Sequence, residues 1–495
     1  MTFDQIGREG IVTVRRLDSE TARNSETTQS PVADRPAKIR VVSLFAGIGG
    51  FDRAFDLADG KVVLQCEYDS FCQSVLRRHW PKVPMANDIR TLIADEIPDA
   101  DVWTAGFPCQ DVSLARGNHG RSGFNGNHTS LFFKLMDLIE VKQPPVVLLE
   151  NVVGLLNSHK GRDFALVLRE LTTAGYAVSW RVLNARYFGA PQSRSRVFLC
   201  AWRGDYRRAL SALFEPTLST KLPSERLGFM TPTAHRSGAI VPQVAYCVAA
   251  TSGRHTGNDW SRSYISYADR VRRPTPTESE RLQGFPAGWS MPEENYPCPM
   301  RGNDGERYRA IGNAVAVPVV KWIANRIVEL YRTPGVSRTE SFIREFQGIA
   351  PELRKDTVPV KFDDIMDGVM TGDFVHRWKT SGCAWGNAIF EATASPAPFK
   401  PVVSQFKDVL DEDVPDDRYF LTPNAAAGIL RRAESVGRTL FEPMKNALAR
   451  SVGKIATDTD PKMGDLFAST SLRSTRTIKR GLVAANGREG SRAYG

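Results

Sequence analysis

The sequence has few of the features that mark metal-binding, disulfide-rich or membrane proteins. Its seven cysteines are scattered without metal-ligand spacing, and the nearest pair, Cys66 and Cys72, has no matching second pair. We therefore expect no metal site and no disulfide framework. No apolar run approaches the roughly 18 residues that can span a bilayer. The amino terminus lacks the apolar core of a signal peptide, so we expect a cytoplasmic protein.

The lack of one glycine is also informative. A β-branched run at 38–45 predicts a buried strand, and the glycine-rich segment 46–50 then leads into a helical pattern at 51–57. This order is typical of a Rossmann-like unit. The dinucleotide fingerprint requires a further glycine where the chain has Asp52. The sequence therefore disfavours a nicotinamide or flavin dinucleotide and favours a smaller nucleoside ligand.

The composition is that of an ordinary globular protein with a basic bias. The chain has 495 residues, enough for about two to four domains. Its net charge of +10 and pI near 9.3 favour a polyanionic partner, of which nucleic acid is the commonest. Residues 1–38 are polar and poor in aromatics, and Ser, Thr, Gly, Lys and Arg dominate 451–495. Both ends are therefore predicted to be disordered.

Strands and helices alternate through the first part of the chain, which predicts a parallel sheet with helices on both faces. Polar residues follow the strand ends, where open α/β sheets bind ligands. Glu67 ends one strand, and its carboxylate can accept both hydroxyls of a ribose; a solvated glutamate is the alternative. Asp88 can accept an adenine amino group while Ile89 packs on the ring. It can instead cap a helix at 91–94.

Two further polar groups follow later strands. Glu150 emerges from an apolar strand at 144–152, so burial should raise its pKa and favour a proton donor near neutrality. Gln192, Arg194 and Arg196 alternate, and on an extended segment they point to one face. Two guanidinium groups on one face suit an anion or a carbonyl oxygen. The alternative is a solvated polar edge.

Cys109 occupies a distinctive position. It follows a short apolar strand that ends near Ala105, Pro108 fixes the backbone before it, and a glycine-rich loop comes after it. A thiol on a rigid strand end followed by a flexible loop suits a nucleophile. Considered alone, a cysteine packed in the core is the competing interpretation.

Taken together, these motifs resemble those of the DNA cytosine-5 methyltransferase family. The resemblance covers roughly residues 39 to 333. Six motifs carry it in the family's order: Phe45-Ala46-Gly47-Ile48-Gly49-Gly50, Phe107-Pro108-Cys109-Gln110, Glu150-Asn151-Val152, Gln192-x-Arg194-x-Arg196, the segment 273–286, and Arg309-Ala310-Ile311-Gly312-Asn313-Ala314-Val315. The implied fold is a Rossmann-like S-adenosylmethionine-dependent methyltransferase sheet with an inserted target recognition domain and a C-terminal extension.

The resemblance also implies catalytic roles. Cys109 would attack carbon 6 of cytosine, which makes carbon 5 nucleophilic toward a sulfonium methyl group. Glu150 would hold ring nitrogen 3 and the exocyclic amine and donate a proton. Arg196, supported by Arg194, would hold the ring carbonyl and stabilise developing charge. The group that removes the carbon 5 proton is not assigned by the sequence.

The implied binding residues fall into two sets. S-adenosylmethionine would be bound by Phe45, Ala46, Gly47, Ile48, Gly49, Glu67, Asp88, Ile89, Pro108, Asn313 and Ala314. Phe45 would stack on adenine, Glu67 bind the ribose and Asp88 bind the adenine amine. Because a cytosine inside a duplex cannot reach a buried thiol, the base must be turned out of the helix. The predicted DNA contacts are Gln110, Ser113, Arg116, Gln192 and Arg254.

The resemblance implies a catalytic and cofactor-binding domain at 39–203, a target recognition domain at 204–270 and a return to the catalytic domain at 271–333. The family pattern does not need the extension at 334–450, which we expect to fold, and the tail at 451–495 is expected to be disordered, like 1–38. Three roles are open for this extension: it contacts DNA, it binds a partner, or it only stabilises the fold. We expect a monomer on double-stranded DNA at the nucleoid, active in restriction–modification or in phage and host defence. A cognate endonuclease is a candidate partner. An RNA cytosine-5 methyltransferase and a non-catalytic DNA-binding relative remain as alternatives.

Overall fold

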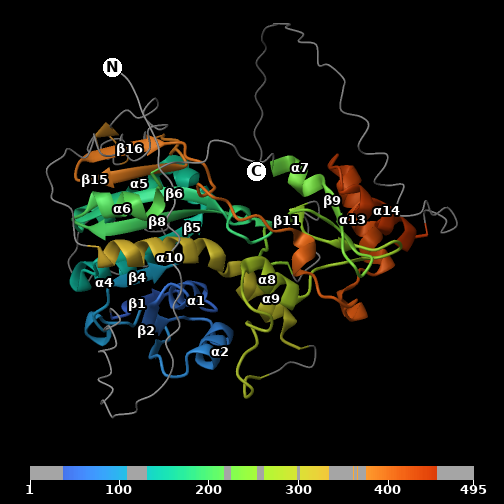
Figure 1. Cartoon of the computed structure of the whole chain (residues 1–495), viewed down its shortest axis with the longest axis horizontal. Helices are drawn as coiled ribbons and strands as arrows, with labels where there is room; N and C mark the ends of the chain where they lie inside the picture. Colours follow the sequence, from blue (N-terminus) through green and yellow to red (C-terminus); the bar gives the residue numbers. More distant parts are fainter. Residues whose placement is uncertain are drawn as a thin grey trace, which may run out of the picture. The chain divides into compact units, whose positions relative to one another are not determined.

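The computed structural model describes residues 37–108, 131–216, 225–252, 261–297, 302–333, 360–361, 365, 369 and 375–453. Within these residues ten strands form one mixed sheet in the order β14-β16-β15-β6-β8-β5-β4-β1-β2-β3 (Figure 1). Neighbouring strands are parallel in one half of this sheet and antiparallel in the other. The parallel half contains the strands that the sequence predicts.

The parallel half confirms the predicted Rossmann-like order. Its strands are β3 (Met85–Ala86), β2 (Gly60–Cys66), β1 (Ile39–Leu44), β4 (Val102–Ala105) and β5 (Val146–Val152), and each pairs in parallel with its neighbour. All four positions of β4 are buried, because helices cover both faces of the sheet. The carboxyl ends of the strands therefore meet along one edge, and the polar residues that follow them lie close together.

The antiparallel half includes strands from the C-terminal region. Its strands are β8 (Ser195–Arg203), β6 (Tyr176–Asn184), β15 (Ser381–Trp385), β16 (Ala388–Ala392) and β14 (Val360–Lys361). Gly382 allows β15 to lie close to β6, since a Cβ there would come within 2.2 Å of the Trp180 indole. The region after residue 334, whose role the sequence leaves open, thus extends the catalytic sheet.

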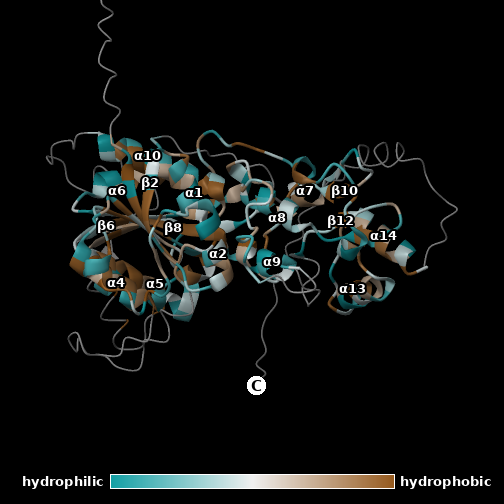
Figure 2. Ribbon diagram, turned by 90° about the horizontal axis from the view of Figure 1, so that it is seen from below, coloured by the Kyte–Doolittle hydropathy of each residue, from teal (hydrophilic) through white to brown (hydrophobic). Residues whose placement is uncertain are grey.

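Helices cover the sheet on both faces (Figure 2). One face carries α1 (Gly50–Asp56), α6 (Tyr206–Leu213) and α10 (Val317–Arg332). The other carries α4 (Leu131–Lys142) and α5 (Arg162–Thr173). Because α6 packs against β6 and β8, the catalytic layers extend to residue 213.

A second, smaller sheet lies in the region predicted to recognise the target. Its order is β13-β12-β10-β9, and its strands are β9 (Pro232–Ala234), β10 (Ile240–Pro242), β12 (Ile265–Ser266) and β13 (Val271–Arg272). Two C-terminal helices, α13 (Pro423–Ser435) and α14 (Glu442–Ser451), bury their apolar residues against Tyr264 and Val271 of this region. The C-terminal region therefore packs on both sheets.

Two helices connect this region back to the catalytic layers. Helix α8 (Pro276–Gln283) begins with a capping box, in which Thr275 and Glu278 satisfy each other's backbone N–H groups. Glu278 also forms a fully buried ion pair with Arg272, at 2.7 Å. Helix α9 (Asp304–Asn313) follows. It contains most of the motif at 309–315, and residues of this motif line a pocket that is described below.

No single helix in the described ranges is long and apolar enough to span a membrane. Only α9 and α10 taken together, across a bend of 41°, meet the requirements of length and composition. The apolar face of α10, with Val319, Ile323 and Ile327, is buried in the core.

Asp52, which replaces the fingerprint glycine, is a fully buried carboxylate between β1, β2 and α1. It accepts hydrogen bonds from the Ser43 hydroxyl at 2.8 Å and the Gln65 amide at 2.7 Å. Burial nevertheless outweighs these bonds and raises the pKa of Asp52 from its ordinary 3.8 to about 6. The folded protein therefore retains a proton between about pH 4 and pH 6 that the unfolded chain releases.

This burial predicts a pH-dependent stability. Because the folded state holds the extra proton, Asp52 favours folding at low pH, and this contribution is lost as the pH rises through about 6. An Asp52→Asn variant cannot titrate at this position. Its free energy of unfolding, relative to wild type, should therefore rise by roughly 2 kcal/mol from pH 4 to pH 7 in denaturant titrations. A difference that stays constant over this range would contradict the assignment.

Candidate active site

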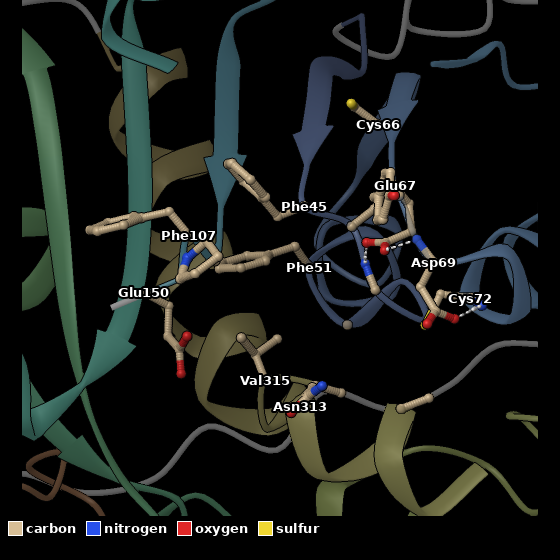
Figure 3. Close-up of a pocket in the computed structure, with 18 of the residues that line it drawn as sticks. Phe45, Phe51, Cys66, Glu67, Asp69, Cys72, Phe107, Glu150, Asn313 and Val315 are labelled. Carbon is tan, nitrogen blue, oxygen red and sulfur yellow. Dashed lines mark hydrogen bonds between the residues drawn. The ribbon is translucent and has the colours of Figure 1, made fainter. Parts of the chain in front are cut away.

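A pocket of about 740 Å³ opens at the carboxyl ends of the parallel strands. Figure 3 shows Glu67 and Glu150 on opposite sides of it, with Phe51 between them. The structure brings twelve of the predicted site residues to its wall: Phe45, Ala46, Gly47, Glu67, Asp88, Ile89, Pro108, Glu150, Arg194, Arg196, Asn313 and Ala314. One cavity thus joins the predicted cofactor residues to the predicted catalytic residues.

The turn after β1 is shaped by left-handed backbone. Gly47 has φ 57°, and a Cβ there would meet no atom within 4 Å, so its backbone faces open space. Phe45 has φ 53°, which is uncommon for a residue with a side chain. Ile48 and Gly49 lie behind the wall: the Ile48 carbonyl accepts a 2.8 Å bond from the Trp289 indole, and Gly49 packs on Trp80. These two residues support the turn rather than line the pocket.

Glu67 is held by backbone donors. Its Oε2 accepts a 2.7 Å hydrogen bond from the Gly47 N–H, and its Oε1 accepts one at 2.8 Å from the Asp69 N–H. Burial raises the pKa of Glu67, while these two bonds oppose the rise. Each carboxylate oxygen has a second lone pair, so both remain able to accept a further hydrogen bond from a ligand.

Asp88 lines the pocket beside a group that the sequence analysis missed. Its carboxylate forms an ion pair with Arg90 at 2.6 Å, which lowers the pKa of Asp88. Arg90 in turn lies 5.1 Å from the ring centre of Tyr68, an aromatic residue that is 72% exposed on the pocket wall. In the sequence, Tyr68 could have been identified as a pocket residue from its position directly after Glu67. The alternative is correct in part: no helix forms at 91–94, since a 3-10 helix covers Ala94–Glu96 instead, but the Asp88 carboxylate does accept a 2.9 Å hydrogen bond from the Arg90 N–H in the turn that follows it.

Glu150 and Arg196, which the sequence predicts to be catalytic, meet at one end of the pocket. Arg196 Nε lies 3.1 Å from Glu150 Oε1, because β5 and β8 are antiparallel neighbours. Burial raises the pKa of Glu150, as the sequence predicts, while Arg196 and then Arg194 oppose the rise. A buried acid and an arginine that face the same space can hold a flat polar ring by its donor and acceptor edges.

Arg194 and Gln192 support this pair from behind. Arg194 is 3% exposed and donates to the carbonyls of Val248, Gly312 and Ala314. The Gln192 side chain is fully buried, and its Oε1 accepts a 3.0 Å bond from the Val248 N–H. The prediction that Gln192 contacts DNA is therefore wrong, since its amide is occupied inside the protein. Gln192 and Arg194 thus hold the segment that precedes Arg196 against residues 247–248.

Cys109 lies outside the described residues, as do Gln110, Ser113, Arg116 and Arg254. The residues directly before Cys109 are described. The Asn151 amide donates a 2.8 Å hydrogen bond to the Phe107 carbonyl, and its Oδ1 accepts one at 2.8 Å from the Val152 N–H. Asn151 thus fixes the chain just before the predicted nucleophile, beside Glu150.

The fold and the pocket define a class of protein. A parallel sheet with a glycine turn, a strand-end acid and an exposed aromatic residue is typical of enzymes that bind a nucleoside cofactor. In the described parts of the chain, no cluster of His, Cys, Asp and Glu could hold a metal ion.

Comparison with known proteins identifies the family. The family model for C-5 cytosine-specific DNA methylase matches residues 39–231 and 230–329. The type II methyltransferase M2.BsuMI of Bacillus subtilis is 32% identical over 333 residues, which cover 63% of this chain and 78% of that protein. M.NlaX of Neisseria lactamica is 31% identical over 317 residues, 58% of this chain and 96% of that protein. The chain belongs to the C-5 cytosine-specific DNA methylase family and is a DNA (cytosine-5-)-methyltransferase.

Proposed function

We propose that this enzyme transfers a methyl group from S-adenosylmethionine to carbon 5 of a cytosine turned out of double-stranded DNA, with Cys109 as the nucleophile. The main support is the continuity of one pocket from Glu67 and Gly47 to the Glu150–Arg196 pair. A cofactor and a base could therefore lie in contact within a single cavity. The family assignment supplies the reaction, and the pocket supplies its proposed residues.

The pocket residues fit S-adenosylmethionine. Glu67 has lone pairs left for the two ribose hydroxyls, and the open backbone at Gly47 leaves room for a close approach. Phe45 and the exposed Tyr68 offer aromatic faces for adenine. Asp88 and Ile89 are the proposed contacts for the adenine edge, with Asn313 and Ala314 on the opposite wall. The bound cofactor would supply an electrophilic methyl group.

The proposed chemistry assigns each protein group one task. The Cys109 thiolate forms a bond to carbon 6 of the cytosine, and the electron pair of the ring double bond becomes available at carbon 5. Glu150 donates a proton to ring nitrogen 3 as charge builds, and Arg196 holds the ring carbonyl. Arg194 acts through Arg196 as a positioning residue. After carbon 5 gains the methyl group, a base that the structure does not assign takes the carbon 5 proton. The bond from sulfur to carbon 6 then breaks, ring nitrogen 3 returns its proton to Glu150, and the ring double bond and the free thiolate are restored.

The biological setting is proposed from relatives. Both relatives named above are type II methyltransferases. We assign the enzyme to a restriction–modification system, in which methylation of one DNA sequence protects the host from a cognate endonuclease. This assignment includes a target recognition domain between β8 and α8, and DNA contacts through Gln110, Ser113, Arg116 and Arg254.

Bisulfite sequencing tests the proposal directly. We expect DNA from bacteria without other cytosine methylation to gain 5-methylcytosine at one short recurrent sequence when they express this chain. The target cytosine of that sequence should change from mostly converted to mostly protected. RNA from the same cells should remain unmethylated by the enzyme. Methylation confined to RNA, or its absence from both nucleic acids in cells that contain folded protein, would contradict the proposal.

A further inference from the structure

A second cavity, of about 270 Å³, shares no lining residue with the large pocket. Four segments of the chain meet there, one of which contributes Gln243 and Val244. The 3-10 helix η4 (Ala185–Tyr187) contributes Arg186 and Tyr187, α7 (Glu225–Met230) contributes Leu227 and Gly228, and the C-terminal region contributes Val403. The family model ends at residue 329, so one side of this cavity comes from a part of the chain that the model does not include.

The one charged residue among those that line the cavity is an arginine. Arg186 is 7% exposed, and its Nη1 has no hydrogen-bond partner in the described parts of the chain. None of the seven residues that line the cavity is acidic. The Tyr187 ring, 5.2 Å from the guanidinium carbon, gives partial compensation only. A buried charge in this state is unfavourable unless another group pairs with it.

A neighbouring arginine shows how this fold satisfies a buried guanidinium. Arg181 is fully buried in β6 and donates to the carbonyls of Leu213, Ser395 and Ala397, at distances of 2.6 to 3.0 Å. Arg186 is almost as well buried, yet no described residue accepts a hydrogen bond from its Nη1. Arg186 is the one charged residue among those that line the cavity, so it is the group with which an anionic ligand would pair.

We propose that this cavity binds a small anion, a carboxylate or phosphate attached to an apolar body. The charged group pairs with Arg186. The apolar body covers Leu227 and Val403, which are 69% and 61% exposed, and contacts Val244. Gly228 keeps the charged group accessible, because a Cβ at this position would come within 2.8 Å of Arg186 Nη2.

The position of the cavity gives the ligand a structural effect. The Val402 N–H donates to the Tyr187 carbonyl at 2.9 Å, and the Phe406 N–H donates to the Gln243 carbonyl at 2.8 Å. The C-terminal segment is thereby joined on one side to the catalytic layers and on the other to the recognition region. A ligand between Arg186, Leu227 and Val403 stabilises this junction, which methyl transfer itself does not require.

Thermal unfolding of the full-length protein tests the proposal without measuring methylation. Benzoate and phenyl phosphate, each compared with sodium chloride at equal ionic strength, are the probes for the two kinds of anion. At about 100 times the dissociation constant, the better probe should raise the wild-type midpoint by about 3 to 5 °C. Acetate and inorganic phosphate, which lack the apolar body, should raise it less. No shift with either aromatic probe would overturn the proposal.

Three variants assign the shift to this cavity. Arg186→Met should lose the shift, whereas Arg203→Met, which removes a cation outside the cavity, should retain it. Should Arg186→Met fail to fold, Val403→Trp decides the matter, because it keeps the cation but fills the space. A shift that is undiminished in Arg186→Met, or undiminished in a folded Val403→Trp protein, refutes the site.

Discussion

Replacing Cys109 by serine is expected to reduce methyl transfer by at least about 1,000-fold. A serine hydroxyl keeps nearly the same size but is a far weaker nucleophile than a thiolate, so attack on carbon 6 becomes the slow step. Cofactor binding should change little, because Glu67 and Gly47 hold the other end of the pocket. Transfer of a labelled methyl group to DNA, with cofactor affinity measured separately by calorimetry, separates the two effects.

A matched control and a covalent trap sharpen this test. Cys383 is fully buried in β15 and remote from the chemistry proposed above, so Cys383→Ala should retain methyl transfer. DNA that carries 5-fluorocytosine should form a denaturant-resistant complex with wild type, because fluorine cannot leave as a proton does. Cys109→Ser should form none. Turnover by Cys109→Ser within tenfold of wild type would remove this residue from its assigned role.

The second large effect is expected at Glu150. An amide cannot transfer a proton to ring nitrogen 3, so Glu150→Gln should lower kcat by about 100- to 10,000-fold. It also removes the ion-pair partner of Arg196, which lies 3.1 Å away. The KM for the cofactor should change by less than about threefold, because the loss concerns the transition state.

The pH profile gives this prediction a second measure. Burial raises the pKa of Glu150, so the protonated form that acts as donor persists to higher pH than in an ordinary glutamate. The wild-type kcat should therefore fall as the pH rises through that pKa, and Glu150→Gln should lack this decline. Glu170→Gln, on the outer side of α5, is the matched control and should behave as wild type. A kcat for Glu150→Gln close to the wild-type value would refute the donor role.

The parallel half of the fold was predictable because each of its strands is encoded locally. An apolar β-branched run such as 39–44, followed by glycines, leaves few alternatives to a buried strand and a turn. The strands from 381–392 were not predictable in this way. Their place beside β6 depends on a close fit between Gly382 and Trp180, two residues far apart in sequence. Such a contact has no periodic signature.

The residues of the site also divide into those that the sequence predicts and those that it does not. Glu67 and Glu150 could be predicted because strand ends in a parallel sheet share one edge. Gln192 was misassigned because its role depends on Val248 and Leu282, which the sequence does not place beside it. The link from Asn151 to the Phe107 carbonyl was equally hidden. Sequence patterns thus identify the chemical type of a side chain better than they identify the residue to which it hydrogen-bonds.

The pairing of β15 with β6 has a consequence for synthesis of the enzyme. Until residues 381–392 leave the ribosome, β6 has no neighbour on one side, and a nine-residue buried strand presents an unpaired edge. Such edges associate readily with other nascent chains. The enzyme therefore completes its large sheet only after residues 381–392 have been synthesised, so chains shortened before this segment should be prone to aggregate.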